Sequence, residues 1–236
     1  MKKKITVLIT AYNEQDTIGN IIHEIKKIID DVIVVDDGSI DDTVSIARKS
    51  GAEVISHHKN QGKGAALKTG FNYAKSHGYD GVITMDGDGQ HLPSELDNFL
   101  TIIENDDPDI ILGNRMDNTR GMPLHRMLTN IFTSKIISRR AHQLIKDSQC
   151  GYRYISTEVL SSIILKTKRF DSENELLMRA SWKGFKIDHI PISTVYFIKR
   201  ESRIKPVRDT WRFILVVVRS YKWERDTLKS LAEKQI

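Results

Sequence analysis

Val82–His91 reads VITMDGDGQH, and the fold is best worked out from this stretch. An apolar run of strand length ends in Asp86 and Asp88, with Gly87 between them. Open α/β sheets bind ligands outside the carboxyl ends of their parallel strands, so both acids are expected at such an edge. Two close carboxylates repel each other unless a cation neutralises them, and oxygen ligands suit Mg²⁺ or Mn²⁺ carrying substrate phosphates. The stretch predicts a metal–diphosphate site; a plain acidic turn is the alternative.

Strands and helices alternate on both sides of this stretch. Lys4–Thr10 and Val32–Val35 are apolar, β-branched runs that predict buried parallel strands. Isoleucines at helical spacing over Ile18–Ile29 predict a helix with one apolar face, which Asn13 could cap. Such alternation implies right-handed crossovers and a mainly parallel sheet in an α/β fold. Further strands are expected at 52–56, 81–85 and 109–112, and helices at 41–50, 62–76 and 94–104.

The pattern changes after Asn114, where one long stretch becomes rich in Arg and Lys. No repeat or linker separates the two parts. We therefore predict one domain over residues 1–205, with a nucleotide-binding half (1–113) and an acceptor half (114–205), followed by a helical tail (206–236). In the second half we expect helices at 124–144 and 171–183, strands at 150–155 and within 185–197, and a helix from 207.

Composition narrows the class of protein. The chain has 236 residues, 39% of them hydrophobic, and a net charge of +5, which is ordinary for a globular protein. Acids and bases are interspersed, so the charge does not indicate nucleic-acid binding, although it permits an anionic substrate or membrane surface. The single cysteine, Cys150, excludes an internal disulfide and fits a reducing cytoplasm. The basic start resembles no signal peptide, and no apolar run reaches the roughly 18 residues of a membrane span.

Three predicted strands end in polar groups. Thr10–Glu14 (TAYNE) follows the first, Asp36–Ser39 (DDGS) the second, and Asp86–Asp88 a later one. Because the carboxyl ends of parallel strands share one edge, these groups can converge there. Singly, Asn13 as a helix cap and Asp37 in a turn would need no ligand. Together they predict one site, and the lack of a Walker loop or a G-x-G-x-x-G argues against an NTPase or a dinucleotide dehydrogenase.

Five motifs, in this order, resemble those of family 2 glycosyltransferases with the GT-A fold: TAYNE, VVDDGSIDDT, NQGKGAALKTG, MDGDGQHLPSEL and DSQCGYRYI. The resemblance is nearest to the dolichyl- or polyprenyl-phosphate sugar synthases and covers residues 5–155 well. It implies a GT-A-type α/β/α sandwich. It also implies inverting, metal-dependent transfer of a hexose from a UDP- or GDP-linked sugar to a polyprenyl or dolichyl phosphate. A hydroxyl of a cell-surface glycan or lipid-linked saccharide is the alternative acceptor.

The resemblance also implies roles for residues of the first half. Tyr12 and Glu14 would line the nucleotide pocket, Asp36 or Asp37 would contact the base or ribose, and Lys63 would approach the phosphates. A solvated lysine at a helix entry is the other reading of Lys63. The implied donor-binding set is Thr10, Tyr12, Glu14, Asp36, Asp37, Lys63, Asp86, Gly87, Asp88 and Gln90. The implied ligands of Mg²⁺ or Mn²⁺ are Asp86 and Asp88, with Gln90 as a further ligand or orienter.

The second half supplies cations. Arg115 and Arg126 resemble family arginines that engage the donor or acceptor phosphate. Arg153 could do the same, or form a structural ion pair. The implied donor-binding set also includes a basic run near the phosphates: Arg200, Arg203 and Lys205.

The acceptor decides whether a general base is needed. A phosphate monoester is already anionic and needs positive neighbours more than a base. A hydroxyl acceptor would require a carboxylate, for which Glu175 or Glu173 is the candidate, since the two point to different helix faces. An acidic helix start stabilised by the helix dipole is the alternative. His91 is expected behind the metal ligands, and Cys150 as a small buried residue.

Residues 206–223 predict a basic amphipathic helix. Arg208 and Arg212 share one face, and Trp211 and Tyr221 lie among apolar neighbours. Such a helix can lie on an anionic membrane, or dock on its own domain or on another subunit of a homo-oligomer. We expect a cytoplasmic protein, peripheral on the membrane if that helix binds it.

Two other functions compete with sugar transfer. A sugar nucleotidyltransferase shares the acidic metal site but normally opens with a Gly-rich basic loop, where this chain has Thr10–Glu14. A catalytically silent binding module would hold a nucleotide without turnover. The intact Asp86 and Asp88 argue against it.

Overall fold

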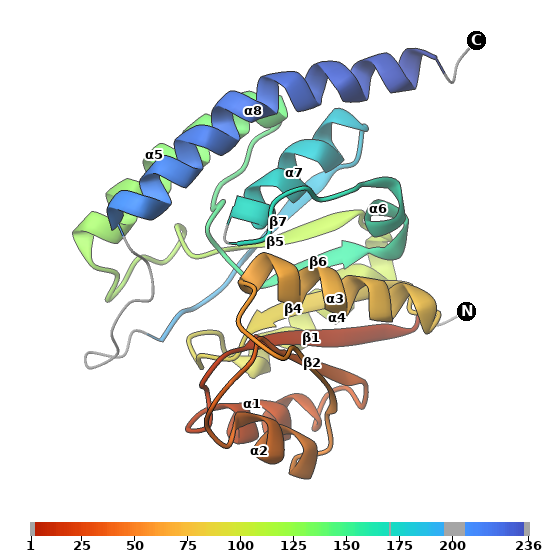
Figure 1. Cartoon of the computed structure of the whole chain (residues 1–236), viewed down its shortest axis with the longest axis vertical. Helices are drawn as coiled ribbons and strands as arrows, with labels where there is room; N and C mark the ends of the chain where they lie inside the picture. The colour runs from red at the N-terminus through yellow and green to blue at the C-terminus, as the bar shows by residue number, and fades with distance from the viewer. Residues whose placement is uncertain (1–2, 170, 196–205, 234–236) are drawn as a thin grey trace.

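The computed structural model describes residues 3–169, 171–195 and 206–233 of the chain. In this part, seven strands form one sheet in the order β3-β2-β1-β4-β6-β5-β7 (Figure 1). The strands are β1 (Ile5–Ala11), β2 (Val32–Asp36), β3 (Glu53–Ser56), β4 (Gly81–Asp86), β5 (Ile110–Asn114), β6 (Arg153–Ser156) and β7 (Ile187–Pro191). The helices are α1 (Ile18–Ile25), α2 (Thr43–Lys49), α3 (Lys63–Ser76), η1 (Pro93–Glu95), α4 (Leu96–Asp106), α5 (Leu124–Ala141), α6 (Thr157–Ser162), α7 (Asp171–Trp182) and α8 (Pro206–Ala232).

The sheet is mainly parallel, as the sequence predicts. The pairs β1–β2, β1–β4, β2–β3 and β5–β7 are parallel, whereas β6 runs antiparallel to both of its neighbours, β4 and β5. Strand β6 comes from the second half of the chain but lies between two strands of the first half. Its first residue, Arg153, is opposite Thr84 of β4, so the loop before β6 reaches the edge where β4 ends.

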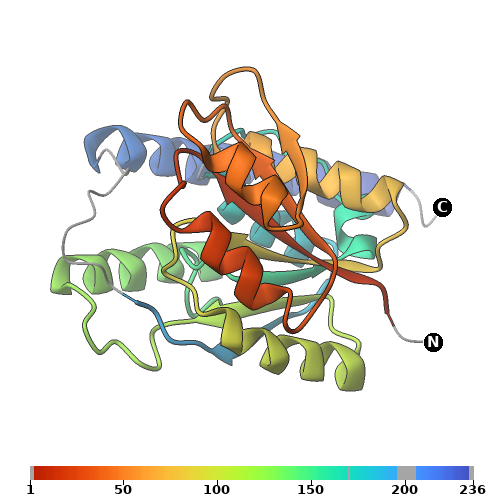
Figure 2. The same ribbon diagram turned by 90° about the horizontal axis from the view of Figure 1, so that it is seen from below.

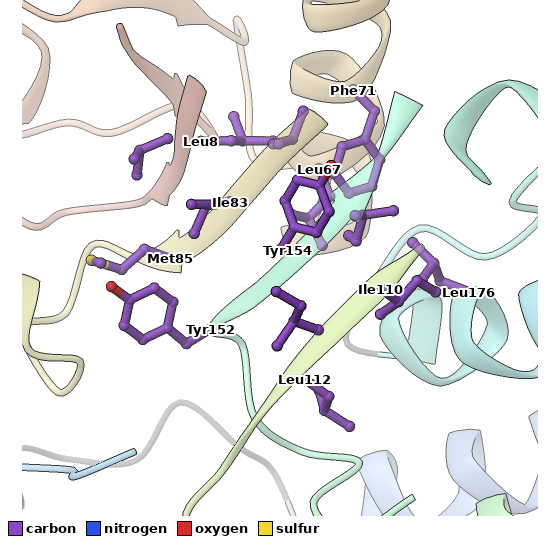
Figure 3. Close-up of a cluster of buried hydrophobic side chains, with 14 of the residues drawn as sticks. Leu8, Leu67, Phe71, Ile83, Met85, Ile110, Leu112, Tyr152, Tyr154 and Leu176 are labelled. Carbon is purple, nitrogen blue, oxygen red and sulfur yellow. The ribbon is translucent and has the colours of Figure 1, made fainter. Parts of the chain in front are cut away.

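Helices cover both faces of the sheet, and α3 and α4 lie on opposite faces (Figure 2). The central strands are buried on both sides, as expected for parallel strands under helices. Leu67 and Phe71 of α3 belong to the buried core, with Leu8 and Tyr154 of the sheet (Figure 3). Gly70 allows the close approach of α3, because a Cβ there would lie 2.3 Å from Leu8 Cδ1.

The prediction that Asn13 caps the first helix is wrong. Helix α1 spans Ile18–Ile25, and its N-cap is Thr17. Asn13 has a φ of +52°, a region that Asn tolerates better than most residues. Its backbone N donates to Ser39 Oγ (2.8 Å), and its side-chain oxygen accepts from Ile40 N (3.0 Å). Asn13 therefore joins the loop after β1 to the loop after β2.

Other boundaries also differ from those predicted. Ile28 and Ile29 lie beyond the end of α1, although they still pack against the core. Helix α5 ends at Ala141, three residues early, because His142 adopts the left-handed conformation that terminates it. Strand β6 begins at Arg153 rather than Cys150. Residues 196–197 of the last predicted strand lie outside the described residues.

Candidate active site

The carboxyl ends of β1, β2 and β4 lie at one edge of the sheet. Thr10 is paired in register with Asp86, and Ala11 with Asp36. The polar groups that follow β1, β2 and β4 are therefore neighbours in space, although they are far apart in the sequence. The parallel order β2-β1-β4 produces this arrangement.

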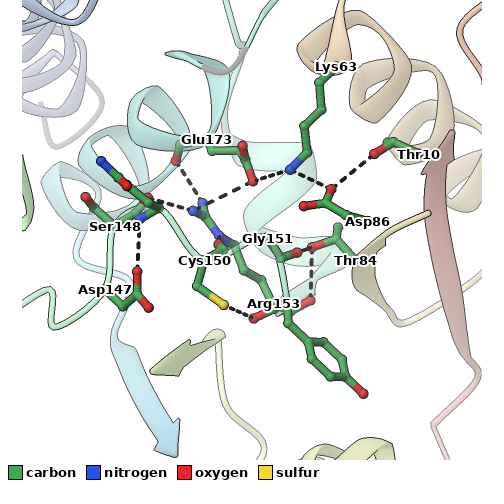
Figure 4. Close-up of polar contacts among 12 residues, drawn as sticks. Thr10, Lys63, Thr84, Asp86, Asp147, Ser148, Cys150, Gly151, Arg153 and Glu173 are labelled. Atoms are coloured by element: carbon green, nitrogen blue, oxygen red, sulfur yellow. Dashed lines mark hydrogen bonds and ion pairs between the residues drawn. The ribbon is translucent and has the colours of Figure 1, made fainter. Parts of the chain in front are cut away.

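Lys63 connects Asp86 to Glu173 in the group of polar contacts at this edge (Figure 4). Its Nζ is 2.6 Å from Asp86 Oδ1 and 3.2 Å from Glu173 Oε1 of α7. Burial alone would lower the pKa of Lys63, but the two carboxylates outweigh it and raise the pKa above its ordinary value. The ammonium group is thus charged at neutral pH. It is not the solvated lysine of the alternative reading, since only 14% of its side chain is exposed.

Glycines make room for this cluster. A Cβ on Gly151 would lie 2.6 Å from Asp86 Oδ2 and 3.0 Å from Lys63 Nζ. A Cβ on Gly64 would lie 2.0 Å from Ser172 Oγ at the start of α7. The motifs NQGKG and DSQCG therefore carry glycine where α3, α7 and the loop before β6 meet.

Asp88 is oriented by Gln90. Gln90 N donates to Asp88 Oδ1 (3.0 Å) and Gln90 Nε2 donates to Asp88 Oδ2 (2.8 Å). Gly87 fastens the turn to β1 and to the loop before α1, because its N donates to Thr10 O (3.1 Å) and its O accepts from Thr17 Oγ1 (2.6 Å). Of the two roles predicted for Gln90, these contacts correspond to the orienter.

A divalent ion fits this edge only with ligands from elsewhere. Among the residues that the structure describes, no group of three or more His, Cys, Asp or Glu side chains could hold a metal. Asp86 and Asp88 supply oxygen donors, which suit Mg²⁺ or Mn²⁺. Such ions keep several waters and commonly complete their coordination with substrate phosphates. Asp86 and Asp88 could therefore be two ligands of such an ion, with the others supplied by water or a phosphate.

Asp36 and Asp37 organise their own loops. Both oxygens of Asp36 accept from Ser39 N at 3.2 Å. Asp37 accepts from Gly62 N (2.7 Å) and Gln61 N (2.9 Å) in the loop that leads to α3. The predicted contact of Asp36 or Asp37 with a base or ribose stays a prediction, and Asp37 also positions the start of α3.

Tyr12 and Glu14 follow the end of β1. Tyr12 is half-buried, whereas Glu14 is buried. Glu14 N donates to Thr43 Oγ1 at 2.7 Å, which joins this segment to the start of α2. Their predicted place in the nucleotide pocket is not decided by these contacts.

Arg115 is held by Asp147, a partner to which the sequence analysis assigns no role. Arg115 Nε donates to Asp147 Oδ2 (2.7 Å) and its Nη2 to Oδ1 (2.8 Å). Asp147 is fully buried and also accepts from Asn130 Nδ2 of α5 (2.7 Å). Burial would raise the pKa of Asp147, but the hydrogen bonds and charge of Arg115 lower it. Asp147 is the first residue of the motif DSQCGYRYI, and its place in that motif is the feature of the sequence that could have indicated its role.

Arg153 forms a structural ion pair, one of its two predicted roles, because its Nη2 lies 3.8 Å from Glu173 Oε1. Its side chain is buried and donates to three carbonyl oxygens, those of Cys150 (2.6 Å), Ser148 (2.9 Å) and Glu173 (3.0 Å). Cys150 is also buried, and burial raises the pKa of its thiol to about 12. Arg126 lies half-buried on the first turn of α5.

The placement of Glu175 does not suit the catalytic role predicted for it. The residue is completely buried and accepts from Lys166 N (2.9 Å), Thr167 N (2.8 Å) and Arg179 Nε (2.6 Å). Its carboxylate anchors the loop before α7. Two residues earlier on the helix, Glu173 faces the Lys63 cluster instead, because positions 173 and 175 point to different sides of α7.

His91 lies behind the acidic pair. It is buried, and its Nε2 is 3.9 Å from Asp86 Oδ2. Burial lowers the pKa of His91 to about 4 against the opposing effect of Asp86, so the ring is neutral at physiological pH. The predicted basic run of Arg200, Arg203 and Lys205 lies outside the described residues.

Comparison with known proteins identifies relatives. Residues 6–164 match the sequence profile described as glycosyl transferase family 2. The UDP-N-acetylglucosamine–dolichyl-phosphate N-acetylglucosaminyltransferase of Methanococcus voltae is 31% identical over 217 residues, 82% of this chain and 86% of that protein. The polyprenol monophosphomannose synthase of Mycolicibacterium smegmatis is 28% identical, over 84% of this chain and 79% of that protein.

A solved structure has the same fold. Glucosyl-3-phosphoglycerate synthase from Mycobacterium tuberculosis, in complex with Mn²⁺, uridine diphosphate and glucosyl-3-phosphoglycerate, superposes with a TM-score of 0.70 at 20% identity. The match covers 94% of this chain and 80% of that one. The predicted fold class is confirmed by this superposition together with the sheet order.

Proposed function

Because this chain belongs to glycosyl transferase family 2, we propose that it transfers a hexose from a UDP- or GDP-linked sugar to a polyprenyl or dolichyl phosphate, with inversion and with Mg²⁺ or Mn²⁺. The names of two relatives support the lipid acceptor, since one is a dolichyl-phosphate N-acetylglucosaminyltransferase and the other a polyprenol monophosphomannose synthase.

The contacts of Glu173 and Glu175 on α7 are the observation that favours a phosphate acceptor over a hydroxyl acceptor. A hydroxyl acceptor needs a general base, whereas a phosphate monoester arrives as an anion. Glu175 is buried and accepts hydrogen bonds from four donors, and Glu173 is paired with Lys63. Neither of these two glutamates is placed as an open base. This favours an acceptor that brings its own nucleophilic oxygen as an anion.

The proposed reaction exchanges one bond at the anomeric carbon. The acceptor phosphate oxygen attacks that carbon, the bond to the β-phosphate oxygen of the donor breaks, and the nucleoside diphosphate leaves with the bonding electrons. Asp86 and Asp88 would hold the metal, which when bound supplies Lewis-acid stabilisation of the leaving group. Gln90 keeps the Asp88 carboxylate oriented, and Asp147 keeps the Arg115 guanidinium fixed.

Transfer of radiolabel from UDP- and GDP-sugars to polyprenyl phosphate, in detergent with Mn²⁺, tests this proposal. We expect lipid-linked product with one nucleotide, loss of activity in excess chelator, and a loss on the order of a hundredfold in Asp88→Ala. Full activity of Asp88→Ala or in chelator contradicts the metal mechanism. Label that appears only on a glycan contradicts the lipid phosphate acceptor.

Membrane contact through α5 and α8 would bring the enzyme to such an acceptor. Among the described residues no helix is long and apolar enough to cross a membrane. Both helices nevertheless expose large apolar side chains; those with at least 44% exposure are Leu124, Leu128, Ile131 and Phe132 of α5 and Trp211, Ile214, Leu215, Val218, Tyr221 and Leu228 of α8. The exposed lysines and arginines on the same helices are Lys135 and Arg139 of α5 and Arg208, Arg219, Lys222, Arg225 and Lys229 of α8. Apolar and basic groups together suit an anionic lipid surface.

A further inference from the structure

Asp86, one of the two proposed metal ligands, is already bound to a cation that belongs to the protein. Lys63 Nζ lies 2.6 Å from its Oδ1, a short charge-assisted contact. Both side chains are largely withdrawn from water, with exposed fractions of 14% and 28%. The pair is therefore poorly screened by solvent.

The backbone around Lys63 holds its ammonium group in this place. Lys63 is the first residue of α3 and follows Gly62, whose N donates to Asp37 Oδ2 (2.7 Å). Glu173 holds the same ammonium group from the other side at 3.2 Å. Gly151 closes over the pair, because any side chain there would collide with Asp86 or Lys63. The contact is built into the fold by α3, α7 and the loop before β6.

We propose that Lys63 is the resident counter-ion of the metal site, which neutralises Asp86 while the donor is absent. A divalent ion at Asp86 and Asp88 would add two positive charges beside Lys63 and beside the buried Arg153, which lies 3.8 Å from Glu173. The three carboxylates of the cluster do not balance these four positive charges. The diphosphate of the donor brings the missing negative charge. Metal and nucleotide consequently bind as a unit, and the metal alone binds weakly. This inference rests on the proposed function only in that the site takes a metal with a diphosphate.

Titration of the folded protein with Mn²⁺, followed by the loss of the free-ion EPR signal, tests the proposal. The natural chain should bind Mn²⁺ weakly alone and much more tightly with UDP or GDP. Lys63→Met should bind Mn²⁺ without nucleotide about tenfold more tightly, because even with water-like screening a neighbouring ammonium group repels a divalent ion by about that factor. Lys75→Met, which removes a lysine near the other end of α3, is the matched control and should behave as the natural chain does.

Glu173→Gln separates the counter-ion role from general damage to the cluster. It removes the second partner of Lys63 but leaves the Lys63–Asp86 pair, so Mn²⁺ binding without nucleotide should remain weak. If folded Lys63→Met binds Mn²⁺ no more tightly than the natural chain, the proposal is wrong. If the natural chain binds Mn²⁺ neither alone nor with any nucleotide, the metal site of the proposed function fails instead.

Discussion

Gln90 is the residue that fixes one proposed metal ligand. Two of its nitrogen atoms donate to the two oxygens of Asp88, so the carboxylate cannot rotate freely. Preorganised ligands contribute to catalysis because they do not reorient during the reaction.

Gln90→Leu should therefore weaken the metal–nucleotide complex without unfolding the protein. We expect a loss of about tenfold to a hundredfold in kcat/KM, as for other residues that orient a metal ligand. The measurements are steady-state transfer and Mn²⁺-dependent binding of UDP or GDP. Unchanged metal and nucleotide affinity in this variant would show that Asp88 does not need the amide.

Asp147 makes the stability of the folded protein depend on pH in the acidic range. Its pKa is lowered in the folded state, chiefly by Arg115, so at pH values between the folded and unfolded pKa the unfolded chain binds more protons. Its contribution to stability is thus present above the unfolded pKa of about 4 and is lost as the pH falls through the folded pKa.

Asp147→Asn should lower the free energy of unfolding at neutral pH by about 3 kcal/mol, because it leaves the Arg115 charge without its carboxylate. The same variant should show a shallower decline in stability below about pH 4 than the natural chain. Urea denaturation between pH 3 and pH 7 measures both effects. Parallel pH profiles for the two proteins would contradict the assignment to Asp147.

The substitution of glutamate by glutamine should mainly affect stability at Glu175 and mainly affect sugar transfer at Glu173. Glu175→Gln leaves Arg179 and two backbone amides with a weaker, neutral acceptor, at a cost on the order of 1–3 kcal/mol of stability. Glu173→Gln keeps a side-chain oxygen that can accept from Lys63, so it should lower transfer activity more than it lowers stability. Thermal unfolding and activity assays separate the two. A stable Glu175→Gln enzyme that has lost activity would restore the catalytic reading of Glu175.

At the level of elements, α8 has two distinct faces. Its buried residues Val216, Ser220, Trp223 and Thr227 recur at helical spacing, and α8 packs mainly on α7. Arg140 of α5 donates from Nε to Ser220 Oγ (2.9 Å), pairs with Glu224, and lies 3.7 Å from the ring centre of Tyr221. Docking on its own domain is thus observed for one face, and the opposite face carries the exposed Trp211 and Val218.

The membrane contact that we propose would use that exposed face. Trp211→Ser with Val218→Ser should reduce sedimentation with vesicles of phosphatidylglycerol and phosphatidylcholine by about tenfold, since each change removes buried apolar area from the lipid contact. Transfer to a short, soluble polyprenyl phosphate should be unchanged. The exposed Thr210→Ser is a matched control on the same helix. Equal binding of both variants to anionic vesicles would exclude this face of α8.

The elements could be predicted from local pattern, whereas their contacts could not. The isoleucine periodicity of α1 and the apolar run of β4 depend on nearby residues, so both are recognisable in the sequence. The antiparallel insertion of β6 between β4 and β5 depends on long-range pairing, and no local pattern encodes it. The same holds for the site: acids after strands were visible, but Glu173 beside Lys63 and Asp147 beside Arg115 come from the second half of the chain, which that insertion joins to the first.

For the molecule as a whole, the sheet joins two parts of the chain across the site. Lys63 and Asp86 come from the first 113 residues, whereas Glu173, Gly151 and Asp147 come from the remainder, and β6 ties the two together in one sheet. A ligand that binds at this edge contacts both parts, and unfolding of either part must release it. Ligand binding should consequently stabilise the entire chain.

A thermal-shift series with UDP, GDP and Mn²⁺ tests that coupling. At about a hundredfold excess over its Kd, the correct nucleotide with Mn²⁺ should add about 2.7 kcal/mol, or roughly 5–10 °C in Tm for a chain of this size. Mn²⁺ alone should shift Tm little, because Lys63 opposes it, and the nucleotide alone should shift it less than the pair does. In Asp88→Ala the extra shift from Mn²⁺ should disappear while the nucleotide shift remains. Additive shifts from metal and nucleotide would mean that the two bind independently, and two separate melting transitions would mean that the parts of the sheet do not unfold together.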